Sequence, residues 1–299
     1  MQDNLLFSII IPTYNRASFI SATVESVLKQ DYQNFEVIIV DDGSTDNTQE
    51  IVEAIADPRV SYYKKENGER AKARNYGTLL AKGAYVNFFD SDDLLYPNHL
   101  SVAMEIIKTN QSPEIFHQNY DILHISTNSA VPSKEIEGDL NLRLVKSGNL
   151  LSCNGVFIRK DIALAFPFNE DRELSASEDY ELWLRLAARF KIHYTNTITS
   201  SIVNHDQRSV LNFKKEKLIK RLHLFIHYIY EDEQFAKKYS DYKNLILSYS
   251  QSYISLHIAL TGKNKATSIN YLFKSFFSSI HVVTTKRFYS IILKILTKY

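Results

Sequence analysis

The sequence of 299 residues is poor in glycine and cysteine and has no long apolar run, and each shortage excludes a class of structure. With only 8 glycines and neither Gly-x-Gly-x-x-Gly nor a glycine-rich loop ending in Lys-Ser/Thr, a dinucleotide or ATP cradle built from backbone amides is not expected. The single cysteine, Cys153, excludes an intramolecular disulfide and is typical of a reducing compartment.

No apolar run reaches the roughly 18 residues that cross a bilayer. The start, Met1-Gln2-Asp3-Asn4, lacks the basic residues of a signal peptide. We therefore expect a cytoplasmic protein, or one peripheral on the inner face of the plasma membrane.

The net charge is +1, but the acidic and basic residues are distributed unevenly along the chain. Residues 1–209 hold 29 acidic and 20 basic side chains, whereas residues 210–299 hold 5 and 15. The two parts thus carry about −9 and +10, which indicates a basic C-terminal region. With 44% hydrophobic residues, the chain can bury a sizeable core in one or two domains.

Strand and helix signals alternate through the first hundred residues. Apolar runs predict buried strands, and helical periodicity lies between them. The expected strands are 5–11, 35–40, 60–63 and 84–89, and the expected helices are 18–30, 46–55 and 70–82. This order predicts an α/β fold with a mostly parallel, Rossmann-like sheet flanked by helices. Because ligands bind beyond the carboxyl ends of such strands, the polar clusters 12–16, 41–44 and 90–93 should converge on one crevice.

The pattern weakens beyond residue 97. It predicts a helix over 98–109, a strand near Ile115, a loop over 126–139, a strand over 154–159 and a helix over 178–190. From residue 211 onward, strand signals vanish and successive amphipathic helices are expected.

The tetrapeptide Asp90-Ser91-Asp92-Asp93 directly follows the last of the four apolar runs. Three carboxylates at the end of a buried strand repel one another and lose hydration, unless a cation or hydrogen-bond donors compensate. Mg²⁺ and Mn²⁺ take oxygen ligands of this kind and usually share them with substrate phosphates. The alternative is a solvated acidic turn that precedes the helix after Pro97.

Five motifs together resemble glycosyltransferase family 2, whose members are inverting enzymes of GT-A fold that use nucleotide sugars. In chain order they are Ser8-Ile9-Ile10-Ile11-Pro12-Thr13-Tyr14-Asn15-Arg16, Val40-Asp41-Asp42-Gly43-Ser44-Thr45-Asp46, Ala73-Arg74-Asn75, Asp90-Ser91-Asp92-Asp93 and Ser177-Glu178-Asp179. The resemblance covers roughly residues 8–209. It implies that residues 1–100 bind the nucleotide sugar, that 101–209 bind the acceptor and carry the base, and that 210–299 form a helical C-terminal extension.

The resemblance implies a set of donor-binding residues. They are Pro12, Thr13, Tyr14, Arg16, Asp42, Arg74, Asp90, Ser91 and Asp92. Tyr14 offers a ring for stacking on the base. Asp42, beside a Gly43 expected at positive φ, would accept from the imide N–H of uracil or thymine, which favours a UDP- or dTDP-type donor. Arg74 would reach the diphosphate or orient the aspartates, and its alternative is a surface ion pair. Residues 12–16 could equally be a plain strand-to-helix turn.

The resemblance also implies a metal site for Mn²⁺ or Mg²⁺ made by Asp90, Asp92 and His205, with Asp93 supporting them. Such an ion would neutralise charge on the departing nucleotide diphosphate. His205 begins a His-x-x-x-Ser element that ends at Ser209 and would close over the donor. Its alternative is an ordinary structural histidine.

Asp179 is the expected general base, which takes the proton of the attacking acceptor hydroxyl. The alternative is that the acidic pair Glu178 and Asp179 only complements the helix dipole. Glu178 and Trp183 are expected to contact the acceptor, with Trp183 stacked on a sugar face or, alternatively, buried in the core.

These roles imply a metal-dependent transfer of a sugar, with inversion, from the nucleotide donor to a saccharide or a lipid-linked saccharide, in bacterial surface polysaccharide synthesis. No nucleic-acid partner is expected. One rival is a nucleotidyltransferase, which would need a glycine-rich, basic N-terminal loop that residues 12–16 do not provide. The other rival is a catalytically silent subunit that binds nucleotide sugars.

Residues 262–299 contain seven Lys or Arg and no Asp or Glu. Apolar residues follow helical spacing in two groups, Ile269, Leu272, Phe273, Phe276, Phe277 and Ile280, and then Phe288, Ile291, Ile292, Ile295 and Tyr299. A basic helix with an aromatic face is able to lie in an anionic membrane interface. The alternative is that these helices pack on the catalytic part and leave their lysines in water.

Overall fold

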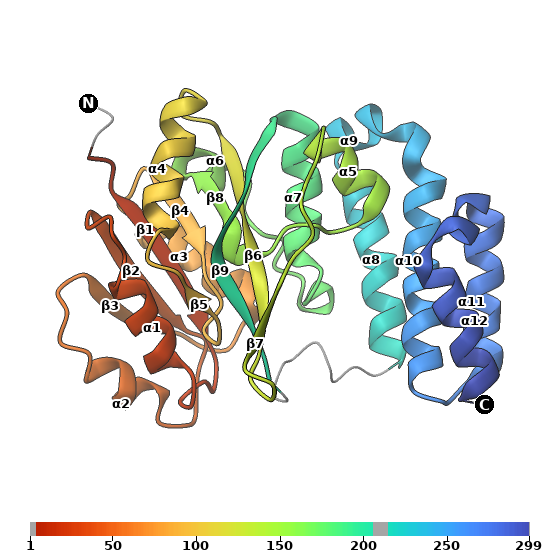
Figure 1. Ribbon diagram of the computed structural model, residues 1–299, viewed down its shortest axis with the longest axis horizontal. Coiled ribbons are helices and arrows are strands. Elements are labelled where there is room, and N and C mark those ends of the chain that lie inside the picture. The colour runs from red at the N-terminus through yellow and green to blue at the C-terminus, as the bar shows by residue number, and fades with distance from the viewer. Residues whose placement is uncertain (1–3, 206–214, 299) are drawn as a thin grey trace.

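The computed structural model describes residues 4–205 and 215–298, which form one mixed sheet with helices on both faces and a helical region beside it (Figure 1). The strands are β1 (Phe7–Thr13), β2 (Phe35–Asp41), β3 (Val60–Lys64), β4 (Tyr85–Phe88), β5 (Leu94–Leu95), β6 (Ile115–His124), β7 (Ser129–Pro132), β8 (Val156–Arg159) and β9 (Ile192–Asn204). The helices of the first part are α1 (Ile20–Leu28), α2 (Thr48–Glu53), α3 (Glu69–Leu80), α4 (His99–Thr109), α5 (Leu140–Ser147), α6 (Lys160–Ala165) and α7 (Glu178–Arg189). Those beyond β9 are α8 (Lys215–Glu231), α9 (Glu233–Lys238), α10 (Lys243–Leu260), α11 (Lys265–Ser278) and α12 (Lys286–Thr297).

The strand order is β3-β2-β1-β4-β8-β6-β9-β5, and β7 pairs with β6. Strands β1 to β4 are parallel to their neighbours in the first half of the sheet, and β6 is parallel to β9. Strand β8 runs antiparallel to both β4 and β6. The expected α/β class is therefore confirmed. The carboxyl ends of β1, β2 and β4 lie at the same edge, which is the edge where the polar clusters were expected.

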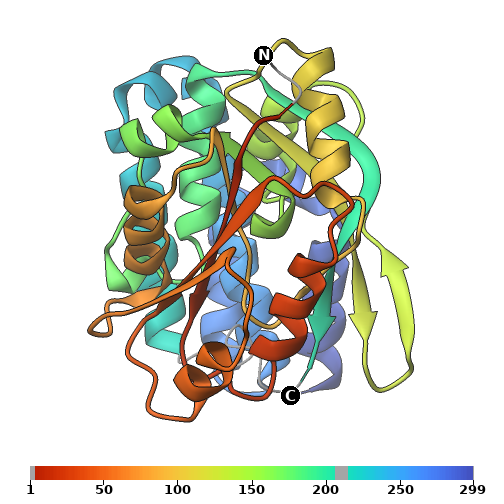
Figure 2. The same ribbon diagram turned by 90° about the vertical axis from the view of Figure 1, so that its left-hand side faces the viewer.

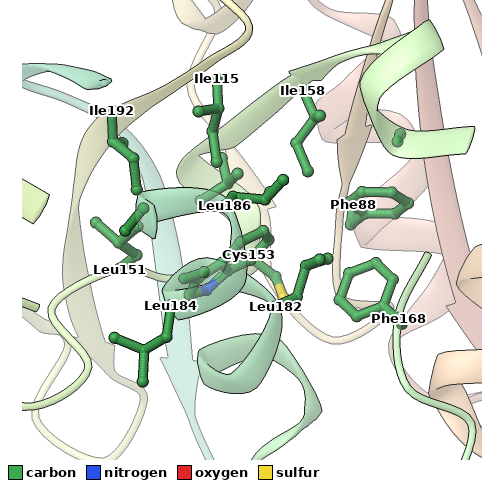
Figure 3. Close-up of a cluster of buried hydrophobic side chains, with 14 of the residues drawn as sticks. Phe88, Ile115, Leu151, Cys153, Ile158, Phe168, Leu182, Leu184, Leu186 and Ile192 are labelled. Carbon is green, nitrogen blue, oxygen red and sulfur yellow. The ribbon is translucent and has the colours of Figure 1, made fainter. Parts of the chain in front are cut away.

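Two hydrophobic clusters cover the two faces of the sheet. Side chains alternate along a strand, so Phe7, Ile9 and Ile11 of β1 pack with α1 and α4 on one face, while Ile10 points to the other. On that second face, α7 inserts Leu182 and Leu186 beside sheet residues, including Ile115 and Ile158 (Figure 3). Burial of this apolar stripe holds the N-terminus of α7 against the sheet.

The C-terminal helices pack on the rest of the protein from the side of α7, behind the N-terminal strands in the view of Figure 2. Phe225 and Ile229 of α8 and Phe235 of α9 join the same cluster as α7. Helices α10, α11 and α12 bury their own apolar contacts, among them Ile258 with Tyr271. None of the helices described is both long and apolar enough to cross a bilayer.

The second half of the sheet differs most from the sequence expectations. The expected loop over 126–139 contains β7, which forms a hairpin with β6. The 13-residue strand β9 had no expected counterpart, because Thr199, Ser200 and Ser201 are buried there in place of aliphatic side chains. Short helices α5 and α6 were also not expected. Ser209 and the expected boundary at residues 209 and 210 lie outside the described residues.

Candidate active site

A cleft of about 680 Å³ opens at the carboxyl ends of β1, β2 and β4. Every residue that the sequence analysis proposed for donor binding lines it, namely Pro12, Thr13, Tyr14, Arg16, Asp42, Arg74, Asp90, Ser91 and Asp92. Glu178 and Asp179 line the same cleft from the first turn of α7. The convergence expected from a parallel sheet is therefore confirmed.

Two loops meet on the side of the cleft proposed for the nucleobase. Asn15 lies at φ 51° and Gly43 at φ 87°, the positive value expected for that glycine. The loops are tied together because the Asn15 N–H donates to Ser44 Oγ at 2.8 Å and the Thr45 N–H donates to Asn15 Oδ1 at 2.8 Å. Tyr14 stays 47% exposed at the rim, so its ring is available for stacking.

Asp42 is buried and held by three donors. Oδ1 accepts from Lys65 Nζ at 2.5 Å and from the Gly68 N–H at 2.8 Å, while Oδ2 accepts from Asn67 Nδ2 at 3.1 Å. Lys65 and Asn67 were not among the expected site residues. Both follow β3, so the rule that placed the other clusters at strand ends would have found them.

The acidic tetrapeptide forms the opposite corner of the cleft. Asp90 Oδ1 accepts from Arg74 Nη2 at 2.8 Å, and Asp92 Oδ2 accepts from Arg16 Nε at 3.2 Å. His205 Nε2 lies 3.2 Å from the same oxygen of Asp92. The cluster is thus not a solvated turn, because positively charged and hydrogen-bonding side chains compensate its carboxylates.

Asp93 supports this corner from below. Its side chain is buried and accepts from Asn154 Nδ2 at 2.6 Å and from the Val203 N–H at 2.8 Å. Burial, with the charges of Asp90 and Asp92, raises the pKa of Asp93 well above its usual value. Asp93 therefore ties the end of β4 to β9 rather than facing the cleft with a free charge.

The donor set at this corner fits a divalent ion that is shared with a diphosphate. Among residues 4–205 and 215–298, no group of three or more His, Cys, Asp or Glu is placed to hold a metal by protein ligands alone. Asp92 uses only Oδ2 in the contacts above, which leaves Oδ1 for a cation. One or two carboxylates completed by phosphate oxygens and water is the usual arrangement for Mg²⁺.

Arg74 links the two acidic groups of the cleft. It is 1% exposed, and its Nη1 donates to Glu178 Oε1 at 2.9 Å while Nη2 reaches Asp90. Of the interpretations considered, the surface ion pair is wrong, because the guanidinium is buried. Glu178 is also buried, so we assign it to positioning Arg74 rather than to direct contact with an acceptor.

Asp179 lies one residue further along α7 and remains half-buried in the cleft wall. Asn149 Nδ2 donates to its Oδ2 at 3.2 Å. Burial and the neighbouring charge of Glu178 raise the pKa of Asp179 to about 6. A carboxylate with a pKa in this range has the basicity that proton abstraction near neutral pH requires.

The proposed sugar-stacking role of Trp183 is wrong. Its side chain is fully buried in the cluster below α7, with Phe168 edge-on at 6.0 Å between ring centroids. Trp183 lies four residues after Asp179 but points to the core, because the packed face of α7 includes Leu182 and Leu186.

The curated proteins to which this chain is similar include two from Escherichia coli. WcaA of Escherichia coli K12, whose name places it in colanic acid biosynthesis as a glycosyl transferase, is 30% identical over 251 residues, which cover 80% of this chain and 87% of WcaA. Escherichia coli WfgD, named a UDP-Glc:alpha-D-GlcNAc-diphosphoundecaprenol beta-1,3-glucosyltransferase, is 33% identical over 187 residues, 62% of this chain and 70% of WfgD. The chain spans less than half the length of several Rickettsia relatives that it matches, 42% in Rickettsia felis.

A crystal structure of Staphylococcus aureus TarS residues 1–349 in complex with UDP-GlcNAc superposes with a TM-score of 0.68 and 21% identity, over 99% of this chain and 89% of that one. This likeness shows that the two chains share the GT-A fold. Residues 8–162, more than half of the sequence, match the profile of Glycosyl transferase family 2. With the motifs gathered in one cleft and the similarity to WcaA, this match shows that the chain belongs to glycosyl transferase family 2.

Proposed function

We propose that this protein transfers a sugar, with inversion, from a UDP- or dTDP-type nucleotide sugar to a hydroxyl of a saccharide or lipid-linked saccharide during surface polysaccharide synthesis. The observation that carries the proposal is that one cleft holds a paired-carboxylate corner and, apart from it, a carboxylate whose pKa is raised to about 6. The corner that holds Asp90 and Asp92 suits the binding of a nucleotide diphosphate. The carboxylate with the raised pKa, Asp179, suits removal of the proton from the acceptor hydroxyl.

In the proposed reaction, the acceptor oxygen attacks the anomeric carbon while its proton passes to the Asp179 carboxylate. The bond between the anomeric carbon and the diphosphate oxygen breaks, and its electron pair leaves with the nucleotide diphosphate. Arg74 keeps Asp90 and Glu178 in place, and Asn149 orients Asp179 through its hydrogen bond. Attack opposite the leaving group is what gives inversion.

Asp90, Asp92 and His205 are the residues that would hold Mn²⁺ or Mg²⁺. Phe19 stacks on the His205 ring at 4.3 Å between centroids, which keeps the imidazole beside Asp92. A bound ion would stabilise the negative charge of the leaving diphosphate as a Lewis acid.

The test is a panel of nucleotide sugars followed by release of the nucleoside diphosphate, with and without an acceptor extract. We expect a UDP- or dTDP-sugar to be turned over in Mn²⁺ or Mg²⁺. Asp92→Ala and EDTA should both weaken binding of UDP. If EDTA-treated protein binds UDP as tightly as the Mn²⁺ form, the metal role is wrong. If no donor is hydrolysed but UDP binds, the silent binding subunit is the better description.

We also propose that α11 and α12 rest on an anionic membrane surface. Phe277, Ile280 and Leu296 are 81%, 70% and 74% exposed, and residues 262–299 include seven basic and no acidic side chains. The alternative, that these helices pack their aromatic face on the catalytic part, does not hold for Phe273, Phe276 and Phe277, since they are 59%, 37% and 81% exposed. Exposed apolar side chains can enter the membrane interface, and the lysines around them attract anionic lipid headgroups.

A further inference from the structure

A second cavity, of about 330 Å³, lies between α7 and the C-terminal helices α8, α10 and α12. Asp179 and Ala176 line both this cavity and the donor cleft. The two spaces therefore meet at the proposed base. Asp90 and Asp92 line the donor cleft but not this second cavity.

Two arginines of the C-terminal helices line this second cavity. Arg221 of α8 donates from Nη1 to the carbonyl oxygen of Ser175 at 3.3 Å, and its buried Nε has no hydrogen-bond partner among the described residues. Arg287 of α12 donates from Nη1 to the carbonyl oxygen of Tyr249 at 3.1 Å and to Ser252 Oγ at 3.3 Å. Within residues 4–205 and 215–298, neither guanidinium forms an ion pair.

This lack of ion pairs sets the two apart from the arginines of the donor cleft, where Arg16 and Arg74 both face carboxylates. Burial lowers the pKa of Arg287, and the groups that act against this shift are the neighbouring tyrosines Tyr253, Tyr249 and Tyr180. Burial and the charges of Arg221 and Arg287 lower the pKa of His257 to about 4, so this neighbouring imidazole is neutral at pH 7. Because partly buried charges are costly unless paired, the arrangement suits an anion supplied by a ligand.

Four aromatic side chains also line the second cavity, namely Tyr180, Phe225, Tyr249 and Tyr253. Tyr180 and Phe225 stack with ring centroids 5.0 Å apart, and Arg287 lies over the ring of Tyr253 at 5.6 Å. Aromatic faces beside guanidinium groups suit a sugar ring that bears a charged ester. Helix packing thus combines an apolar surface and a positive one beside the base.

We propose that the second cavity binds the acceptor through a phosphate ester, with Arg221 and Arg287 holding its phosphate or diphosphate oxygens while the acceptor hydroxyl lies at Asp179. Each guanidinium fork can donate two hydrogen bonds to one anionic group, and two arginines supply two positive charges, which match a phosphate or diphosphate better than the single charge of a carboxylate. This inference rests on the proposed function and deepens it, because it names the chemical class of the acceptor.

Binding is tested with inorganic pyrophosphate, titrated into protein whose donor cleft is first saturated with UDP and Mn²⁺. We expect pyrophosphate to bind, and Arg221→Gln or Arg287→Gln to weaken it about 10-fold or more, as charge-assisted hydrogen bonds predict. Arg287→Lys should recover part of the affinity. Lys220→Gln and Lys286→Gln are matched controls, since each removes a neighbouring charge that does not line the cavity. Among the described residues, the hydrogen bond that Arg221→Gln removes is the one to the Ser175 carbonyl oxygen, so we expect this variant to fold. It therefore tests pyrophosphate binding even if Arg287→Gln fails to fold.

The proposal is overturned if pyrophosphate binds only in the absence of UDP. It is also overturned if the two lysine variants weaken pyrophosphate binding as much as the arginine variants do. A transfer assay then compares three acceptors with one sugar: a neutral glycoside, a water-soluble sugar phosphate and the same phosphate with an alkyl chain. Equal KM values for the neutral glycoside and the sugar phosphate contradict the inference. A lower KM for the phosphate that carries an alkyl chain indicates a lipid-linked acceptor. If wild type turns over no donor but both arginine variants lose pyrophosphate, the proposed function fails while the anion site stands.

Discussion

At the scale of single residues, the cleft depends on side chains that each bind two or more partners. Arg74 binds Asp90 and also Glu178, which lies 104 residues further along the chain than Arg74, and Asp42 accepts from three donors in the loop after β3. Asp179 differs from these carboxylates, because the hydrogen bond from Asn149 is the side-chain contact that holds it in the described structure. It is therefore the carboxylate best placed to accept a proton.

Asp179→Asn should lower turnover on the order of 10²-fold or more while the melting temperature and the affinity for UDP stay unchanged. The substitution keeps the shape of the side chain and removes its basicity. Steady-state kinetics with the true acceptor would test this. A rate like that of wild type would remove Asp179 from the role of base.

The activity of wild-type protein should rise with pH through about 6 and then level off. The base accepts a proton only when ionised, and because the pKa of Asp179 is raised, the ionised form is lost as pH falls through that value. A profile of kcat/KM between pH 4.5 and 8 measures the limb. If the residual activity of Asp179→Asn rises with pH in the same way, the rise reflects the ionisation of a residue other than Asp179.

Asp42→Ala should weaken UDP binding by roughly 1–3 kcal/mol, because the imide N–H of the base would be left without an acceptor. Calorimetry with UDP, dTDP, GDP and CMP measures both the loss and the preference. Tighter binding of CMP than of UDP by wild type would contradict the assignment of Asp42 as the base reader.

At the scale of elements, the close approach of α3 to the sheet positions Arg74. Gly77 of α3 faces β1 and β2, and a Cβ at this position would overlap Ile10 Cγ2 and lie 3.3 Å from Val40 Cγ2. Both neighbours are buried β-branched residues, so neither has room to move away. The missing side chain is what allows α3 to carry Arg74 into the cleft.

Gly77→Ala should therefore destabilise the protein by roughly 1–3 kcal/mol, the usual cost of overpacking. Urea unfolding measures the change. Gly68→Ala is the matched control, because the nearest atom to a Cβ there is Cδ of Lys72, an exposed side chain that has room to move. Equal stability of Gly77→Ala and wild type would show that α3 has freedom to shift.

At the scale of the whole molecule, the helical extension is part of the same body as the sheet. Phe225 and Phe235 join the core below α7, while Ile258 and Ile295 bury the contacts of α10 and α12. Removing residues 262–299 would therefore uncover α10 rather than release a separate anchor. Membrane contact is better tested with single exposed residues.

Phe277→Ser and Leu296→Ser should each reduce flotation with anionic liposomes and leave the melting temperature unchanged, because both side chains are exposed. Each Lys or Arg near an anionic surface contributes about 1 kcal/mol, so high salt should also weaken binding. Leu79→Ser, at a 70% exposed position on α3, is the control. Intact protein that ignores anionic liposomes at low salt ends the membrane proposal.

The meeting point of the polar clusters follows from the order of strands along the chain. Parallel strands end at one edge, so Thr13, Asp42 and Asp90 had to converge once their apolar runs were recognised as adjacent strands. Gly43 was likewise predictable, because the turn after β2 needs positive φ. These inferences depend only on order along the chain and on local backbone chemistry.

The other features of the site depend on how elements that are distant in the chain pack together. The direction in which α7 packs buried Trp183 and left Asp179 in the cleft, although both lie on one helix. Strand β9 was not expected, because serine and threonine occupy buried positions in it. Arg221 and Arg287 line one cavity although their helices are distant in sequence. Local periodicity carries no information on how distant helices pack, because that depends on side-chain fit across the whole core.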